Sequence, residues 1–140
     1  MMKPEPVSGN ATKSEMDIIP LSECPSFITK DGSGIRELLS HRNSSIRNQS
    51  LAEATIGPGV LTELHYHKVT EEIYFITRGT GVMTLGNRTC RVTTGDAIAI
   101  PPGQTHQILN DGDEDLVLLC CCAPGYEHSD TYLVSPDLLS

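Results

Sequence analysis

The sequence predicts an all-β protein built as an antiparallel sandwich or barrel. Short runs of β-branched and aliphatic residues recur along its 140 residues, and clusters of glycine, proline and asparagine separate them. Helical periodicity is almost absent. Many short strands at regular spacing are typical of an antiparallel sandwich or barrel. A chain of this length has room for one hydrophobic core and is too short for two comfortable domains.

The N-terminal flank is predicted to lie outside the barrel. Residues 1–16 are rich in polar residues and proline and are expected to form a disordered tail. Residues 17–47 are expected to contribute strands and loops that pack on the barrel or on a dimer partner. Within them, 27–29 and 35–39 are candidate strands around a turn, although 35–39 has a short helix as its alternative.

Residues 48–123 are predicted to form the barrel itself. The expected strands are 60–67, 73–77, 82–85, 91–93, 97–100 and 116–122. Gly86-Asn87 has the composition of a two-residue hairpin turn. No internal repeat is visible, which argues against two barrels in one chain. Residues 124–140 are either a lid over the barrel mouth or an exposed tail, and the sequence does not favour one over the other.

Three histidines and a glutamate in the barrel segment are candidate metal ligands. His65 and His67 are two residues apart in a predicted strand, so both point to the same face about 6.6 Å apart along the chain. Glu72 follows five residues later, and His106 lies in the segment Gly95-Asp96-Ala97-Ile98-Ala99-Ile100-Pro101-Pro102-Gly103-Gln104-Thr105-His106. Imidazole and carboxylate groups together suit a divalent transition metal, namely Fe, Mn, Ni, Co, Cu or Zn.

Two segments of the chain resemble the paired motifs of the cupin superfamily. The first consists of Gly59, His65, His67, Glu72 and Gly79. The second consists of Gly95, Pro101, Gly103, His106 and Asn110. The fifteen residues between the motifs, 80–94, resemble the spacing of compact single-domain bacterial cupins. The resemblance covers residues 48–123. Within the superfamily, the chain resembles small proteins of the mannose-6-phosphate isomerase-like type, but this likeness indicates little about the substrate.

The resemblance implies a cupin jelly-roll barrel, a double-stranded β-helix, with one divalent metal held by His65, His67, Glu72 and His106. It also implies a homodimer. Strand parity alone does not choose between the adjacent Glu71 and Glu72, because each shares a face with apolar residues. The spacing of the cupin motif favours Glu72 as the ligand and places Glu71 outside.

Candidate substrate contacts are Tyr74 and Gln49. Tyr74 has the same strand parity as Glu72 and is therefore expected to line the pocket. Gln49 and Glu53 share one face of their segment, and they are either substrate contacts or part of a solvated face. Arg36 and Arg47 are either an anion clamp or ordinary surface charges.

The five cysteines are predicted to be reduced. They are Cys24, Cys90 and the run Cys120-Cys121-Cys122. An odd number without a secretory signal does not indicate a disulfide framework. In a strand, Cys120 and Cys122 share one face, where they either fill the core or line the pocket and tune the metal. His41 and His128 match no motif and are expected not to be ligands.

Four protein ligands leave one or two open positions on a metal, unlike a closed structural zinc site. We therefore expect an enzyme acting on a small oxygen-rich metabolite, with dioxygenase chemistry ahead of isomerase or cyclase chemistry. The alternative is a non-catalytic metabolite-binding cupin with a structural metal. Fold and ligands do not choose between these functions.

Charge and hydropathy predict which partners the protein does not bind. The formal net charge is −8, which opposes binding to nucleic acid or to an anionic membrane surface. No stretch approaches the roughly 20 apolar residues of a membrane span. The N-terminus lacks the apolar run of a secretory signal, so a cytoplasmic location is expected.

Overall fold

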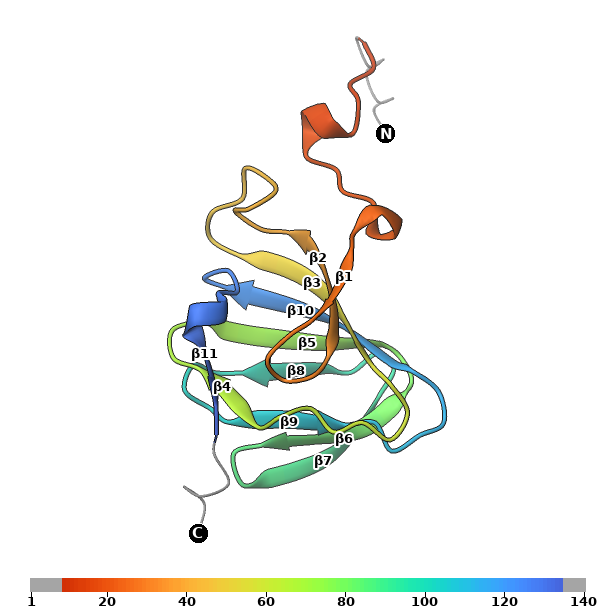
Figure 1. Ribbon diagram of the computed structural model, residues 1–140, viewed down its shortest axis with the longest axis vertical. Helices are drawn as coiled ribbons and strands as arrows, with labels where there is room; N and C mark the ends of the chain where they lie inside the picture. Colours follow the sequence, from red (N-terminus) through yellow and green to blue (C-terminus); the bar gives the residue numbers. More distant parts are fainter. Residues whose placement is uncertain (1–8, 135–140) are drawn as a thin grey trace, which may run out of the picture.

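The computed structural model describes residues 9–134, which contain eleven strands and three short 3-10 turns but no α-helix (Figure 1). The turns are η1 (Ser14–Met16), η2 (Leu21–Glu23) and η3 (His128–Asp130). The strands are β1 (Ser26–Ile28), β2 (Gly34–Leu39), β3 (Ser50–Ile56), β4 (His65–His67), β5 (Glu71–Arg78), β6 (Thr80–Leu85), β7 (Arg88–Thr93), β8 (Ala97–Ile100), β9 (His106–Leu109), β10 (Leu116–Ala123) and β11 (Thr131–Leu133). The expected all-β class is confirmed.

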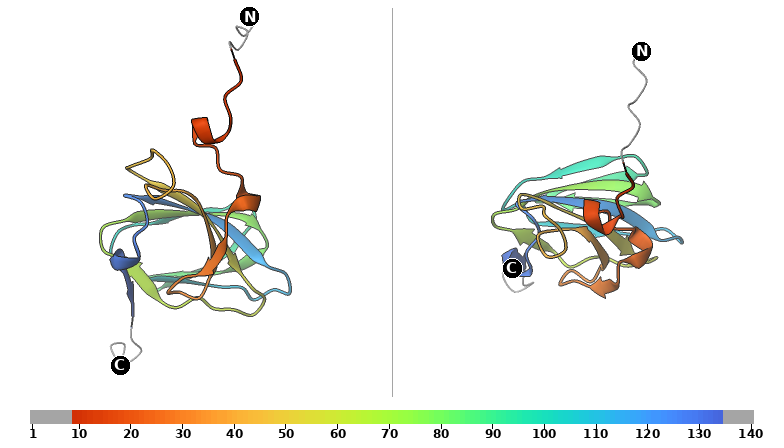
Figure 2. Two further views of the ribbon diagram at one scale, coloured as in Figure 1. Left: turned by 45° about the horizontal axis from the view of Figure 1, so that its top comes forward. Right: turned by 90° about the horizontal axis from the view of Figure 1, so that it is seen from above.

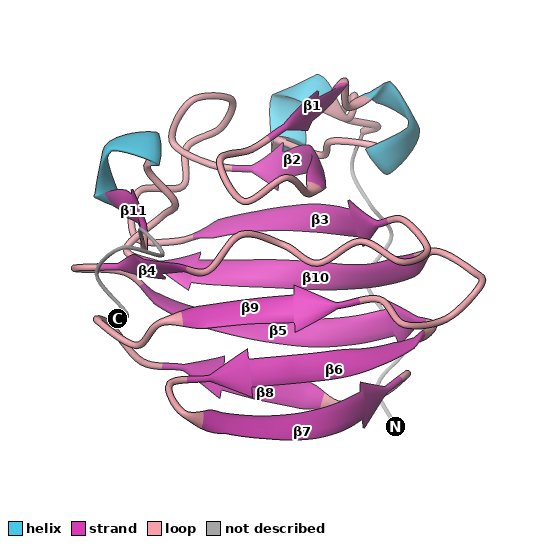
Figure 3. Ribbon diagram, turned by 60° about the horizontal axis from the view of Figure 1, so that its bottom comes forward, coloured by secondary structure: helices cyan, strands magenta, loops and turns pink. Residues whose placement is uncertain are grey.

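The strands form two antiparallel sheets. One has six strands in the order β1-β2-β3-β10-β5-β8, and the other has five in the order β11-β4-β9-β6-β7. Figure 3 shows the two sheets one behind the other, with the 3-10 turns beside β1, β2 and β11. Both sheets contribute buried side chains to one core, including Ile56, Ile76, Met83, Ile108 and Leu118. The barrel interior is therefore packed at its centre.

Alternation of side chains positions the functional residues on the barrel interior. In β5, Glu72, Tyr74 and Ile76 are buried, whereas Glu71, Ile73 and Phe75 between them are exposed. The same alternation holds in β10, where Cys120 and Cys122 are buried and Cys121 is not. Successive side chains of a strand point to opposite faces, so one inward residue fixes the orientation of the rest.

The hairpin predicted at Gly86-Asn87 is confirmed. Leu85 of β6 pairs with Arg88 of β7, which leaves two residues for the turn. Gly86 has a φ of 60°, a conformation that glycine adopts without the steric penalty of a Cβ atom.

Two elements differ from expectation or resolve an alternative. Residues 34–39 form β2, which pairs with β3, and not a helix. The strand expected over 60–67 is limited to 65–67, because residues 57–64 cross from β3 in one sheet to β4 in the other. In this crossing Leu61 makes a single bridge to Leu109.

The two flanks of the barrel are described only in part. Residues 9–16 of the predicted tail are exposed and include η1, while residues 1–8 lie outside the described residues. In the C-terminal segment, residues 124–134 hold η3 and β11, and residues 135–140 are not described. β11 pairs with β4. Among the described residues, no helix has the length and apolar character needed to cross a bilayer.

Candidate metal centre

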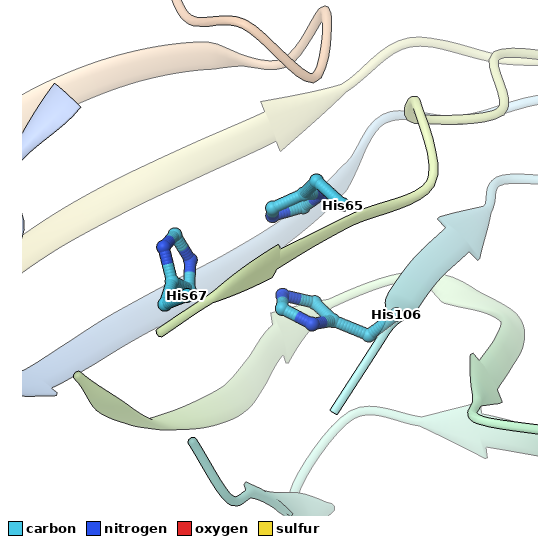
Figure 4. Close-up of side chains that lie close together, drawn as sticks. All are labelled: His65, His67 and His106. Carbon is cyan, nitrogen blue, oxygen red and sulfur yellow. The ribbon is translucent and has the colours of Figure 1, made fainter. Parts of the chain in front are cut away.

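The three candidate histidines meet at the open end of the barrel. His65 and His67 point inward from the same face of β4, and His106 is the first residue of β9, where it pairs with His65. All three are buried, and their ligand nitrogens lie within 4.8 Å of one another. Figure 4 shows the three rings converging on one space from the two strands. His106 is far from the other two histidines in the sequence, and the pairing of β9 with β4 brings it next to them.

The protonation of two of these rings follows from their backbone contacts. Nδ1 of His65 lies 2.8 Å from the carbonyl oxygen of Glu63, and Nδ1 of His106 lies 3.0 Å from that of Gln104. A carbonyl oxygen only accepts hydrogen bonds, so each Nδ1 carries a hydrogen and donates it. In the neutral ring, Nε2 is then left with a free lone pair that faces the centre.

His67 reaches the same state through a hydroxyl group. Its Nδ1 lies 3.3 Å from Oγ1 of Thr131, and that hydroxyl donates its hydrogen to the carbonyl of Glu127 at 3.1 Å. The hydroxyl oxygen therefore accepts from Nδ1 of His67, which in the neutral ring leaves Nε2 without a hydrogen. In their neutral forms the three rings thus direct Nε2 lone pairs toward one space, the arrangement that metal-ligating histidines adopt.

Glu72 completes the cluster from β5. Its Oε1 lies 3.3 Å from Nε2 of His67 and 3.4 Å from Nε2 of His106. Oε1 of Glu72 and Nε2 of His106 are buried and have no hydrogen-bond partner among the described residues. Buried polar atoms are rarely left unsatisfied, and a cation between these atoms would satisfy both. The neighbouring Glu71 is exposed.

The electrostatics of the centre keep the carboxylate charged. Burial acts to raise the pKa of Glu72, but its contacts with His106 and His67 outweigh this and lower the pKa to about 2. Burial, together with the nearby His106, lowers the pKa of His65. For His67, burial is opposed by the Glu72 carboxylate, and the net pKa is raised. An anionic carboxylate beside lone-pair nitrogens suits a divalent transition metal.

Two of the cysteines face this centre as thiols. Cys120 and Cys122 line the cavity, and Sγ of Cys122 donates a hydrogen bond to Oε2 of Glu72 at 3.3 Å. Burial and the negative charge of Glu72 raise the pKa of both thiols, so both stay protonated at neutral pH. None of the five cysteines forms a disulfide between described residues.

A cavity of about 60 Å³ opens above the centre. Its floor is apolar and comes from β3, β9 and β10, with Ala52, Ala54, Ile56, Ile108 and Leu118. Its rim comes from the β1–β2 hairpin and the C-terminal segment, which approach each other across the opening (Figure 2, left). The rim supplies two polar residues that sequence reasoning missed as site residues, Asp31 and Tyr126. Asp31-Gly32 was interpretable only as a turn, and no motif includes Tyr126.

The two predicted substrate contacts lie in different places. Tyr74 lines the cavity, and its ring packs edge-on to His106 with 5.8 Å between centroids. Gln49 is exposed, precedes β3 and is not among the cavity-lining residues. In β3 the small residues Ser50, Ala52 and Ala54 face the cavity, so Glu53 points the other way.

The remaining polar candidates lie away from the cavity lining. They are His41, His128, Arg36 and Arg47. His41 Nε2 instead lies 2.6 Å from Oε1 of Glu127, and Arg47 binds the carbonyls of Ser44 and Ile46.

Comparison with known proteins gives a consistent assignment. The profile of the cupin domain (Cupin_2) matches residues 52–122. An uncharacterized protein of Methanocaldococcus jannaschii is 49% identical over 108 residues, covering 77% of this chain and 86% of that protein. An oxalate-binding protein of Thermotoga maritima is 32% identical over 82 residues, covering 59% of this chain and 68% of that protein.

Solved structures share the fold. A Thermotoga maritima protein described as a predicted oxalate decarboxylase superposes with a TM-score of 0.68 at 26% identity, covering 76% of this chain and 98% of that one. A Streptomyces nucleoside dehydratase superposes with a TM-score of 0.69 at 15% identity, covering 83% and 88%, a likeness of fold alone. The two sheets are thus those of the double-stranded β-helix, and this chain belongs to the cupin domain family.

Proposed function

We propose that this protein is a metal-dependent enzyme that binds one divalent transition metal through His65, His67, Glu72 and His106. Its substrate is a small oxygen-rich metabolite bound in the cavity above them. The observation that carries the proposal is the convergence of three Nε2 atoms, each of which carries a lone pair in the neutral ring because a partner occupies Nδ1. In the metal-free protein the Glu72 carboxylate favours a proton on His67, and a bound cation would take the place of that proton.

The chain's own residues supply the setting for chemistry. The four ligands leave the side facing the cavity open to a substrate, as catalytic sites require. A metal bound here would polarise a substrate oxygen, or activate dioxygen if it is redox-active. Tyr74 and the apolar floor restrict the bound molecule to a small one and exclude water from beneath it. Within this class we propose dioxygenase chemistry first, ahead of isomerase or cyclase chemistry. A mannose-6-phosphate isomerase-like activity is part of the second group.

A second candidate function is non-catalytic binding of a metabolite around a structural metal. The oxalate-binding protein of Thermotoga maritima, which is 32% identical to this chain over 82 residues, favours it. Both proposals assign the same four metal ligands, and they differ in whether the protein converts the bound metabolite.

The test is elemental analysis of protein purified without an affinity metal, combined with oxygen uptake across catechols, diketones and flavonols. Near-stoichiometric Fe, Cu, Ni, Mn or Co with substrate-dependent oxygen consumption supports the dioxygenase. Zinc without oxygen uptake supports the isomerase, cyclase or binding alternatives. Absence of any metal after reconstitution contradicts the assignment of the four ligands.

His106→Ala separates a catalytic metal from a structural one. In an enzyme, this variant loses metal and turnover while the barrel stays folded, because the core lies beneath the site. In a purely structural site, its main effect is a lower melting temperature. His128→Ala is the matched control, since His128 is exposed and outside the cavity lining.

A further inference from the structure

Asp31 is held with one carboxylate oxygen fixed and the other directed at the centre. Its Oδ1 accepts three hydrogen bonds, from Thr29 Oγ1 at 2.6 Å and from the backbone N–H and Oγ of Ser33 at 3.0 and 2.6 Å. Its Oδ2 lies 3.8 Å from Nε2 of His65. The Asp31 carbonyl also accepts the N–H of Glu63 at 2.7 Å, which ties the turn to the chain entering β4. This carboxylate is therefore positioned before any ligand arrives.

Tyr126 approaches the same cavity from the opposite end of the chain. Its ring packs edge-on to His67 with 5.9 Å between centroids, and its hydroxyl is buried without a hydrogen-bond partner among the described residues. Its backbone is fixed on both sides, by Ser50 Oγ on its N–H and by Arg42 on its carbonyl. A buried phenol without a partner is costly unless a ligand satisfies it.

Asp31 and Tyr126 line the same cavity. Burial raises the pKa of Tyr126, the nearby Thr131 side chain opposes that rise without meeting the geometry of a hydrogen bond, and the negative charges of Asp31 and Glu72 add to it. The phenol therefore remains protonated at neutral pH and able to donate a hydrogen bond. A carboxylate that accepts and a phenol that donates together match one hydroxyl group, which does both.

The charges around the cavity disfavour a strongly anionic ligand. Lys30 is the one lysine or arginine among the described lining residues, and its ammonium group already donates to the carbonyls of His128 and Thr131. Glu37, also in the lining, is paired with Arg42 at 2.6 Å. A divalent metal next to the carboxylates of Glu72 and Asp31 is already neutralised, so a dianion would add uncompensated negative charge.

From these contacts, and on the basis of the proposed function, we infer that Asp31 and Tyr126 form a hydroxyl-binding subsite beside the metal, selective for an uncharged hydroxy-carbonyl or polyol substrate over a dicarboxylate. The substrate hydroxyl donates to Oδ2 of Asp31 and accepts from the hydroxyl of Tyr126. A second oxygen of the same small molecule faces the metal. This selectivity separates the chain from its relative named for oxalate binding.

The test measures binding rather than turnover. Protein loaded with Mn²⁺ is titrated with dihydroxyacetone or with oxalate, and the fall in water proton relaxation reports displacement of metal-bound water. The wild type is expected to bind dihydroxyacetone more tightly than oxalate. Asp31→Asn is expected to weaken dihydroxyacetone and strengthen oxalate, shifting the ratio of the two dissociation constants at least tenfold. Tyr126→Phe is expected to weaken dihydroxyacetone by about threefold to tenfold, the loss of one hydrogen bond.

Matched variants control for charge and for the loss of a phenol. Asp113→Asn removes one negative charge from an exposed loop, and Tyr132→Phe removes a phenol from an exposed ring that stacks on Tyr66. Both should leave the ratio unchanged. A wild type that prefers oxalate, or an Asp31→Asn variant with an unchanged ratio, overturns the inference. So does loss of Mn²⁺ from Asp31→Asn, because Asp31 is then a metal ligand. Failure of the wild type to bind any metal is a different result, which overturns the proposed function itself.

Discussion

At the scale of single residues, the centre depends on where each histidine hydrogen lies. A buried histidine with a donor and an acceptor both satisfied is an ordinary core residue. Here each Nδ1 is satisfied by a carbonyl or a hydroxyl, while Nε2 of His106 is buried and unpaired. This distinction depends on the groups that contact the Nδ1 atoms, which belong to Glu63, Gln104 and Thr131. Those three residues are not defining positions of the two cupin motifs.

Cys122 is expected to orient Glu72 for the metal. Its thiol donates to Oε2, which leaves Oε1 directed at the histidines. Cys122→Ala should lower metal affinity about tenfold, as the loss of such outer contacts does in other sites. Cys122→Ser retains a donor and should retain affinity. Competition with a chromophoric chelator measures the change.

Cys120→Ala is the matched control, because Cys120 is also buried, lines the same cavity and loses the same volume. It has no hydrogen bond to Glu72 among the described contacts. Equal metal affinities for the two alanine variants would contradict the orienting role.

Glu72 is expected to make the metal-free protein sensitive to acid. Its pKa of about 2 in the folded state lies below the value of 4.5 for an unperturbed group. Its contribution to stability is therefore complete above pH 4.5 and is lost as the pH falls toward 2, a difference on the order of 3 kcal/mol. Denaturant unfolding at pH 7 and pH 3 measures most of this difference, because about 2 kcal/mol of it is lost by pH 3. Glu72→Gln should lose less stability over this interval than the wild type, whereas Glu71→Gln should match the wild type.

At the scale of elements, parity and turns account for what was predictable from sequence. One inward residue in β5 determines the orientation of the others, so once the motif spacing had selected Glu72, parity placed Tyr74 on the same face, and both are buried. The cavity rim was not predictable. Asp31 reaches His65 only because β2 pairs with β3, and Tyr126 reaches His67 because β11 pairs with β4. Neither strand pairing can be read from the sequence near Asp31 or Tyr126.

Gly81 in β6 is expected to be a packing requirement. A Cβ atom there would lie 2.5 Å from the carbonyl oxygen of Leu109 and 2.9 Å from Cδ2 of Leu116. Moving the backbone of the neighbouring strand would disrupt its pairing with β6. Gly81→Ala should therefore lower the free energy of unfolding, measured in urea, by about 1–3 kcal/mol. Gly57→Ala is the control, because its Cβ would meet only Val60 at an ordinary 3.7 Å. Equal unfolding free energies for the two variants would refute the steric argument.

At the scale of the whole molecule, assembly and location are still predictions. The homodimer has an apolar surface available on the outer face of the six-stranded sheet, where Ile73 and Phe75 are 48% and 39% exposed. These residues pair with Cys121 and Leu119 of β10, which extend the apolar surface. The cytoplasmic location and the absence of nucleic-acid and membrane partners likewise rest on the sequence.

Light scattering on the protein as it elutes from a size-exclusion column tests the dimer. The expected mass is twice that of the chain, and Phe75→Asp should shift it toward the monomer because a buried charge opposes pairing. Val69→Asp, at another exposed apolar residue, should leave the dimer intact. A wild-type mass equal to one chain would rule out the homodimer.

The bond from Lys30 to the carbonyls of His128 and Thr131 has a consequence for synthesis on the ribosome. It joins the β1–β2 hairpin, which is made early, to η3 and β11, which are made about a hundred residues later. The histidine pair of β4 and its partner in β9 are synthesised before Thr131, whose hydroxyl contacts Nδ1 of His67 from 64 residues further along the chain. A nascent chain that has not yet reached β11 therefore lacks the contact that orients His67, and the complete set of oriented ligands forms only after β11 has been made.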